Sequence, residues 1–233
     1  MILKPLGRIE PATWEHVEKY ALRREMAIAM PPAPVTFGVN WYSSFDNPIK
    51  DRDGKWWVGR DGNLGYIRGG HCAVMEHKAV DLTSWYNFYD QGEEGACVGF
   101  GTSRMMSLLN RKRYDARELW EMAKEVDEWD DTVRGDNNGT SVRAAMDILR
   151  LHGHIPWTKK RIMQPSEGIS ANRWATNIDD LFSVLQNPLY TKLGAIPFLN
   201  SWGQAYPRRV WVTCEVWQRL MNEYGEFTMI TDR

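Results

Sequence analysis

Asp90–Gly101 reads DQGEEGACVGFG and decides the expected fold. A glycine-rich turn leads to Cys97, and the stretch after it, VGFGTSRMMSLLNRKRY, spaces its apolar residues as an amphipathic helix does. Cys97 then falls in the first turn of that helix, where the pKa of a thiol drops below its usual value of about 8.5. Gln91, six positions earlier, is placed to donate its side-chain NH₂ to an oxyanion. The stretch predicts a thiol nucleophile, and the alternative is a buried structural cysteine.

Two other segments carry residues that complete such a site. YIRGGHCAVM places His71 after two glycines at the start of an apolar strand, and glycine permits close backbone approach or an unusual dihedral angle. AIPFLNSWG ends an apolar run at Asn200, which suits holding an imidazole in one tautomer, and Trp202 follows as a shield against water. Each segment alone has an ordinary interpretation as a turn or a structural histidine. Together with Cys97 they indicate a thiol hydrolase.

The segments QGEEGAC, GGHCAV and FLNSWG together resemble the three active-site segments of papain-type cysteine peptidases. The resemblance implies that Cys97 is the nucleophile and that His71 is the general base and acid. It also implies that Asn200 orients the histidine and that Gln91 is the oxyanion donor. The supporting positions are Trp202, Gly70 and Gly95.

The order of these residues departs from that of the familiar enzymes. Here His71 comes before Cys97, and Asn200 follows both, whereas the familiar order is Cys, His, Asn. Because a triad is defined by geometry and roles, the chain resembles a permuted papain-type protein. It is also similar to permuted proteins of tailed bacteriophages, especially those that infect actinobacteria, which implies a viral origin. The Glu pair at 93 and 94 opposes ionisation of the thiol unless both side chains face solvent.

The expected fold class is α+β, with a papain-like two-lobe fold in permuted element order: a helical lobe that carries the Cys helix against a barrel-like antiparallel sheet. Residues 1–33 form a charged N-terminal arm and Pro-rich linker, and 34–233 form one papain-like domain. Within that domain the expected parts are 34–80, a sheet lobe with His71; 81–165, a helical lobe with Cys97; and 166–233, the completion of the sheet lobe with Asn200. Helices are predicted near 13–26, 97–113, 115–128, 140–152, 176–185 and 214–224, and strands at 35–42, 55–59, 66–75, 195–199, 209–213 and 226–230.

Composition excludes some classes of partner. A net charge of −1 gives no electrostatic case for nucleic acid or an anionic membrane. The three cysteines do not make a disulfide framework. We expect no cofactor and no metal, because the acidic run at 127–131 lacks the spacing of a calcium loop. No apolar run is long enough to span a membrane, and the start lacks the pattern of a signal peptide. The expected location is the host cytoplasm or a virion.

Three functions fit these features. The leading one is a papain-like cysteine hydrolase that cleaves a peptide or protein substrate through an acyl-enzyme at Cys97. The second is a virion or tail component that keeps the fold and binds other phage subunits through the 1–33 arm, since charged arms often order only against a partner. The third is an endopeptidase that cuts peptide cross-links in peptidoglycan. Replacing Cys97 with Ala separates the enzymes from the scaffold.

Overall fold

Strands β1 (Val35–Tyr42) and β4 (Ile67–Met75) pair antiparallel at the centre of the sheet. The computed structural model describes residues 31–79, 84–128, 139–157, 166–204 and 206–232, and Pro32–Arg233 forms one unit. The helix predicted near 13–26 lies outside the described residues, as does nearly all of the 1–33 arm.

The described strands form one sheet in the order β2-β3-β7-β6-β4-β1-β8-β5. Its other members are β2 (Ile49–Lys50), β3 (Trp56–Val58), β5 (Ala171–Trp174), β6 (Ala195–Leu199), β7 (Val210–Thr213) and β8 (Glu226–Asp232). Every neighbouring pair is antiparallel except β3 and β7, which run parallel. The sheet is therefore open and mixed, whereas the sequence predicted a barrel-like antiparallel one. The parallel pair cannot come from a hairpin, because a hairpin joins antiparallel strands, so it depends on how distant segments meet in the fold.

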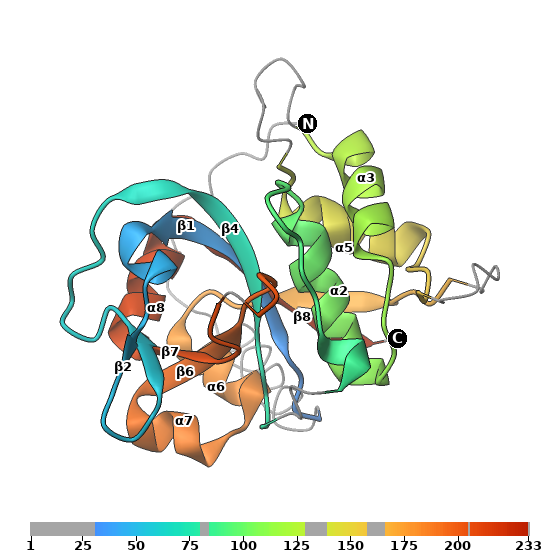
Figure 1. Cartoon of the computed structure of the whole chain (residues 1–233). Helices are drawn as coiled ribbons and strands as arrows, with labels where there is room; N and C mark the ends of the chain where they lie inside the picture. The colour runs from blue at the N-terminus through green and yellow to red at the C-terminus, as the bar shows by residue number, and fades with distance from the viewer. Residues whose placement is uncertain (1–30, 80–83, 129–138, 158–165, 205, 233) are drawn as a thin grey trace, which may run out of the picture. The chain divides into compact units, whose positions relative to one another are not determined.

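Six α-helices flank this sheet in the part of the chain that is described. They are α2 (Cys97–Asn110), α3 (Ala116–Val126), α5 (Val142–Leu151), α6 (Ile178–Leu185), α7 (Pro188–Leu193) and α8 (Cys214–Asn222). Figure 1 shows α2, α3 and α5 together on one side of the β1–β4 ribbon, with α6, α7 and α8 on the other. The predicted α+β class is confirmed. Helix α7 and strands β2 and β5 were not predicted, because each is too short to show a clear hydrophobic period.

Alternation along β4 separates two hydrophobic cores. Ala73 and Met75 belong to one core, together with many aromatic side chains; Cys72 and Val74 belong to the other, together with residues of α2 and α5. Successive side chains of a strand point to opposite faces, so His71 and Cys72 also diverge. Cys72 is fully buried in the core. We call these the ring-rich core (including Phe37, Trp41, Phe45, Phe198, Trp217 and Phe227) and the helix-side core (including Cys72, Val98, Met105, Met106 and Met146).

Two glycines allow α2 to approach its neighbours closely. A Cβ added at Gly101 would lie 2.8 Å from Sγ of Cys72, and one added at Gly99 would lie 2.3 Å from the main-chain oxygen of Ala116. Both distances are far shorter than a carbon contact permits, so any side chain here forces the elements apart. These glycines set how deeply the Cys-bearing helix sits against β4 and α3.

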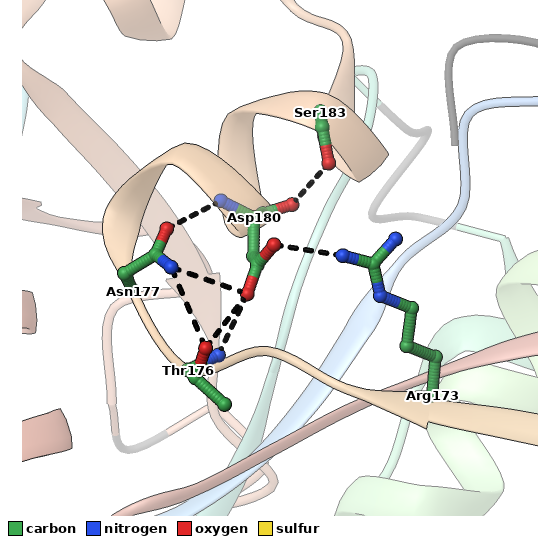
Figure 2. A network of polar contacts seen from close by, with 5 residues as sticks. All are labelled: Arg173, Thr176, Asn177, Asp180 and Ser183. Carbon is green, nitrogen blue, oxygen red and sulfur yellow. Dashed lines mark hydrogen bonds and ion pairs between the residues drawn. The ribbon is translucent and has the colours of Figure 1, made fainter. Parts of the chain in front are cut away.

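Helix α6 begins in a network of polar side chains, drawn in Figure 2. Asn177 caps the helix by accepting a hydrogen bond from the main-chain N–H of Asp180. The Asp180 carboxylate accepts from Thr176 and pairs with Arg173 of β5 at 2.7 Å. The network ties the edge strand to the helix that follows it. Among the described residues, no helix combines the length and apolar character needed to cross a membrane.

Candidate active site

His71, in the middle of β4, meets Asn200 just past the end of the neighbouring strand β6. His71 lies on β4, and Asn200 directly follows β6, which pairs with the far end of β4. Nε2 of His71 lies 2.8 Å from Oδ1 of Asn200. Both side chains are buried. Residues that are 129 positions apart in the chain are thus brought into direct contact by strand pairing.

A second hydrogen bond shows which residue is the donor in the His71–Asn200 contact. The main-chain N–H of Ser201 also donates to Oδ1 of Asn200, at 2.8 Å. A main-chain N–H can only donate, so the shared atom is the amide oxygen and His71 must donate to it from Nε2. The proton of the neutral ring therefore lies on Nε2, and the lone pair lies on Nδ1. This is the tautomer that a general base needs.

Two indole rings hold the imidazole in place. The ring centroid of His71 lies 4.4 Å from that of Trp41 and 4.9 Å from that of Trp202. The two indoles also contact each other, at 5.3 Å. Trp202 occupies the position predicted for a shield over the Asn–His contact. Trp41 was not predicted, because in VTFGVNWY it is one of several alternating apolar residues and looks like ordinary core.

The Trp41 indole is itself anchored by a charged pair. Its Nε1 donates to Oδ1 of Asp46 at 2.8 Å, and Arg68 pairs with the other carboxylate oxygen. Arg68 is the extra residue of a bulge in β4, where Gly69 takes a φ of 154°. A glycine at a bulge is a common way to bend a strand. Gly70, beside the histidine, is exposed, and open space surrounds the position of its missing Cβ.

Cys97 is the first residue of α2, as the sequence predicted. Its half-buried thiol is surrounded by main-chain donors: its own N–H and those of Val98 and Cys72. Because the N–H of Cys72 belongs to the peptide unit after His71, the thiol lies directly against the backbone that carries the imidazole. Among the described residues, no hydrogen bond joins the Cys97 thiol to the His71 ring. The structure thus brings the nucleophile candidate next to the base candidate without a direct bond.

Burial controls the ionisation of both groups. It raises the pKa of the Cys97 thiol, and the surrounding main-chain N–H groups only partly oppose it. It also lowers the pKa of His71 from 6.5 to about 4, against the opposing effects of the Asn200 hydrogen bond and the Asp46 charge. A low dielectric disfavours either charged form. The expectation of a lowered thiol pKa is therefore wrong for the resting state, in which both groups are neutral at pH 7.

Gln91 is held beside this site by backbone pairing. Its main-chain N–H donates to the Ser201 carbonyl at 2.8 Å, so the turn before the Cys helix is joined to the Asn200 loop. Its buried side chain donates from Nε2 to the Glu94 carbonyl at 3.0 Å. An amide NH₂ carries two hydrogens, so one remains for a ligand. Gly95 is half-buried in this same turn, between Glu94 and the N-terminus of α2.

The acidic pair before the cysteine faces away from the thiol. Glu93 and Glu94 are both exposed, and Glu94 forms an ion pair with Arg117 at 2.9 Å. Both carboxylates therefore face solvent, which is the condition under which the Glu pair does not oppose ionisation of the thiol. Their charge is screened by water and by Arg117, and it has little effect on Cys97.

Arg104 is a further residue near the site that the sequence did not identify. It lies on α2, seven positions after Cys97, and its side chain is buried. One guanidinium nitrogen donates to the main-chain carbonyl of Asn200. The available signal was a charged residue within the apolar stripe of the predicted helix.

A cavity of 730 Å³ opens elsewhere, between the turn after β1 and the loop that leads into β4. Its lining includes Ser44, Asn47, Asp51, Trp57 and Arg60. Cys97, His71 and Asn200 do not line it, so it is separate from the candidate catalytic residues. Over the described ranges, no group of three or more His, Cys, Asp or Glu side chains is arranged to hold a metal ion.

The comparisons with known proteins add no family to this geometry. No protein-family model, no curated protein and no solved structure matches the chain.

Proposed function

We propose that the chain is a papain-like cysteine hydrolase that cleaves peptide bonds through a Cys97–His71–Asn200 triad. The hydrogen bond from His71 to Asn200, with its direction fixed by Ser201, is the observation that carries this proposal. An oriented imidazole has its lone pair on Nδ1, and a cysteine at a helix N-terminus lies against the adjoining backbone. A purely structural histidine requires neither feature.

The arrangement of elements also supports a permuted papain-like architecture. The helix that begins at Cys97 packs on β4, and β4 carries His71. Asn200 enters from β6 on the neighbouring edge of β4. Nucleophile and base thus come from a helix and a strand that face each other, although their order in the chain is reversed. The viral origin and the virion location implied by the resemblance remain part of the same hypothesis.

The reaction follows from the positions of the groups. Sγ of Cys97 attacks the substrate carbonyl carbon while Nδ1 of His71 takes the thiol proton. The oxyanion is stabilised by N–H groups at the start of α2 and by the free hydrogen of the Gln91 amide. The imidazolium then protonates the leaving amine, and an acyl-enzyme remains. His71 next removes a proton from water, which attacks the thioester and releases the acid and the thiol.

Because the resting pair is neutral, proton transfer accompanies attack. The imidazolium that forms is stabilised by its contact with Asn200 and by the nearby Asp46 charge, both of which raise the pKa of His71. We therefore expect the rate of Cys97 alkylation to keep rising with pH above neutrality, since burial raises the thiol pKa. A preformed ion pair would instead give a rate that is already constant at mildly acidic pH.

The test is mass spectrometry after brief treatment with E-64, an epoxide that alkylates activated papain-type thiols. We expect a single thioether adduct at Cys97 that is lost in His71→Ala. Cys214→Ala is the matched control, because Cys214 is also a half-buried free thiol, and its loss should leave labelling unchanged. Cleavage of a peptide library, absent in Cys97→Ala, then establishes the activity.

The other outcomes discriminate the alternatives. If the protein cuts cross-linked peptidoglycan peptides but not ordinary peptides, the wall endopeptidase is the correct member of the class. If Cys97 reacts no faster than Cys214 and no substrate is cut, the triad is inactive and the virion or tail component remains.

A further inference from the structure

A buried arginine lies directly behind the candidate triad. Arg104 is 6% exposed, although arginine is almost never fully buried unless it is paired. Its Nε and Nη2 donate to the main-chain carbonyl of Asn87 at 3.2 and 2.6 Å, and its Nη1 donates to that of Asn200 at 2.5 Å. Two main-chain carbonyls thus take up all three of its nitrogens.

No carboxylate lies within ion-pair distance of Arg104 among the residues that the structure describes. Burial lowers the pKa of Arg104 to about 10, so the side chain stays charged at neutral pH. The guanidinium is buried against these carbonyl oxygens and the Tyr89 ring, whose centroid lies 5.9 Å away, and the Glu76 charge is also near enough to raise its pKa. Apolar residues often replace such buried charges without loss of stability. The arrangement is better explained by what the guanidinium holds in place.

The guanidinium joins the nucleophile's helix to the residue that orients the base. Arg104 follows Cys97 by seven residues, which at 3.6 residues per turn places both on the same face of α2. It binds the main chain of Asn200, whose side chain in turn contacts His71. Asn200 is therefore fixed at its carbonyl by α2 and at its amide by Ser201.

We propose that Arg104 is a positioning residue that sets the His71–Asn200 contact relative to Cys97. It acts through Asn200 and touches neither the thiol nor the ring. The effect of Arg104 on the reaction rate rests on the proposed function. The contact itself can be tested whether or not the protein is an enzyme.

A merely structural arginine makes different predictions. In that case, replacing Arg104 destabilises the fold by leaving the Asn87 and Asn200 carbonyls unpaired, but in the molecules that remain folded the imidazole is unchanged. If Arg104 positions Asn200, the folded variant must show an altered imidazole.

The first experiment is ¹H–¹⁵N NMR of the histidine rings in the full chain, with His71 assigned through His71→Ala. The variants are Arg104→Met, which keeps the apolar stem, and Arg104→Lys, which can reach one carbonyl. Arg150→Met is the control, because Arg150 is a surface residue of α5 that pairs with Asp147. We expect His71 to lose its pure Nε2–H tautomer in Arg104→Met, to keep part of it in Arg104→Lys and to be unchanged in Arg150→Met. An unchanged His71 tautomer in a folded Arg104→Met protein overturns the proposal.

The second experiment is a double-mutant cycle with Asn200→Ala on peptide cleavage. In the wild-type background we expect Arg104→Met to lower kcat by on the order of 10²-fold, the scale of a small misplacement of reacting groups, with little change in KM. In the Asn200→Ala background the same change should cost no more than about threefold, because residues in one network are not additive. If the two substitutions lower kcat independently, so that their fold-losses multiply, the proposal is contradicted. A wild-type protein without activity refutes the proposed function alone, because the NMR result still decides the role of Arg104.

Discussion

The two cores on either side of β4 hold the two halves of the candidate site in different ways. The ring-rich core packs His71 against the indoles of Trp41 and Trp202, which also contact each other. The helix-side core has small and flexible side chains next to α2, and glycines that bring backbone against backbone. Rigid rings determine the orientation of the imidazole, and close approach determines the position of the thiol. The imidazole needs a fixed orientation, whereas the thiol mainly needs to lie close to it.

The polar groups of the two sides also differ. On the ring-rich side, the His71–Asn200 contact leaves Nδ1 of His71 and Nδ2 of Asn200 without a hydrogen-bond partner among the described residues. On the helix side, the buried His154 contacts Ser103 at 2.7 Å and stacks on Tyr114 at 4.9 Å. His71 thus keeps a free ring nitrogen at the candidate site, whereas His154 is enclosed. This contrast leads to the following tests.

The largest effect is expected on acidification, and mainly from His154. Burial lowers the pKa of His154 from 6.5 to about 3 and that of His71 to about 4. As the pH falls below 6.5, the unfolded chain binds protons that the folded protein excludes, so the free energy of unfolding decreases. The loss continues until the folded-state pKa is reached. For His154 it amounts to about 3–5 kcal/mol.

Urea unfolding at pH 7, 4.5 and 3.5 measures this loss, because the contributions of the two histidines separate only below the folded-state pKa of His71, about 4. His154→Gln keeps a polar partner for Ser103 and should flatten the pH dependence more than His71→Gln does. Comparing each variant with the wild type removes the contribution of the carboxylates, which acts in the same direction. Equal pH dependence in the wild type and in His154→Gln would show that the enclosed ring is protonated when folded.

The next effect compares two glycines, one packed between helices and one open on β4. Gly99→Ala places a methyl group against the Ala116 carbonyl and the Trp120 Cβ, at 2.3 and 2.7 Å, so α2 and α3 must separate. We expect a loss of about 3 kcal/mol and a fall in Tm of roughly 6–12 °C. Gly70→Ala is the control, because open space surrounds Gly70, and it should change stability by less than about 0.5 kcal/mol. Similar losses in both variants would mean that the loss in Gly99→Ala does not come from the close packing of α2 against α3.

Much of this architecture follows from patterns that a sequence displays directly. The spacing after Cys97 predicted α2, whose first residue is that cysteine. Apolar runs predicted β4 and β6, and the two residues that meet are His71, where the apolar part of β4 begins, and Asn200, directly after β6. These predictions succeed because periodicity and strand ends depend on local residue types.

The features that were missed depend on contacts between distant segments. Trp41 has the alternation of a core residue, and only the pairing of β1 with β4 places it on the imidazole. Arg104 binds main-chain carbonyls, which every residue possesses, so no residue type identifies its partners. The direction of the Cys97 pKa was wrong because the helix N-terminus is visible in the sequence whereas burial is not. The mixed sheet likewise depends on a pairing between segments far apart.

The smallest effect distinguishes two tryptophans of the ring-rich core. Trp41 donates from Nε1 to the Asp46 carboxylate at 2.8 Å, and Trp217 donates from Nε1 to the Ile196 carbonyl at 3.1 Å. Replacing either with Phe keeps a ring and removes one hydrogen bond, so each variant should lose about 1–2 kcal/mol. Of these two tryptophans, only Trp41 contacts His71, so only Trp41→Phe should lower the pKa of His71, because the Asp46 charge that raises it is no longer held in place.

Histidine NMR titration and the rate of E-64 labelling measure this difference. We expect Trp41→Phe to slow labelling of Cys97 by no more than about tenfold and Trp217→Phe to leave it unchanged. If both variants slow labelling equally, the reactivity of the thiol follows the stability of the whole ring-rich core. If only Trp41→Phe does so, the indole that lies on the imidazole has a role separate from packing, and the two sides of β4 divide orientation and proximity between them.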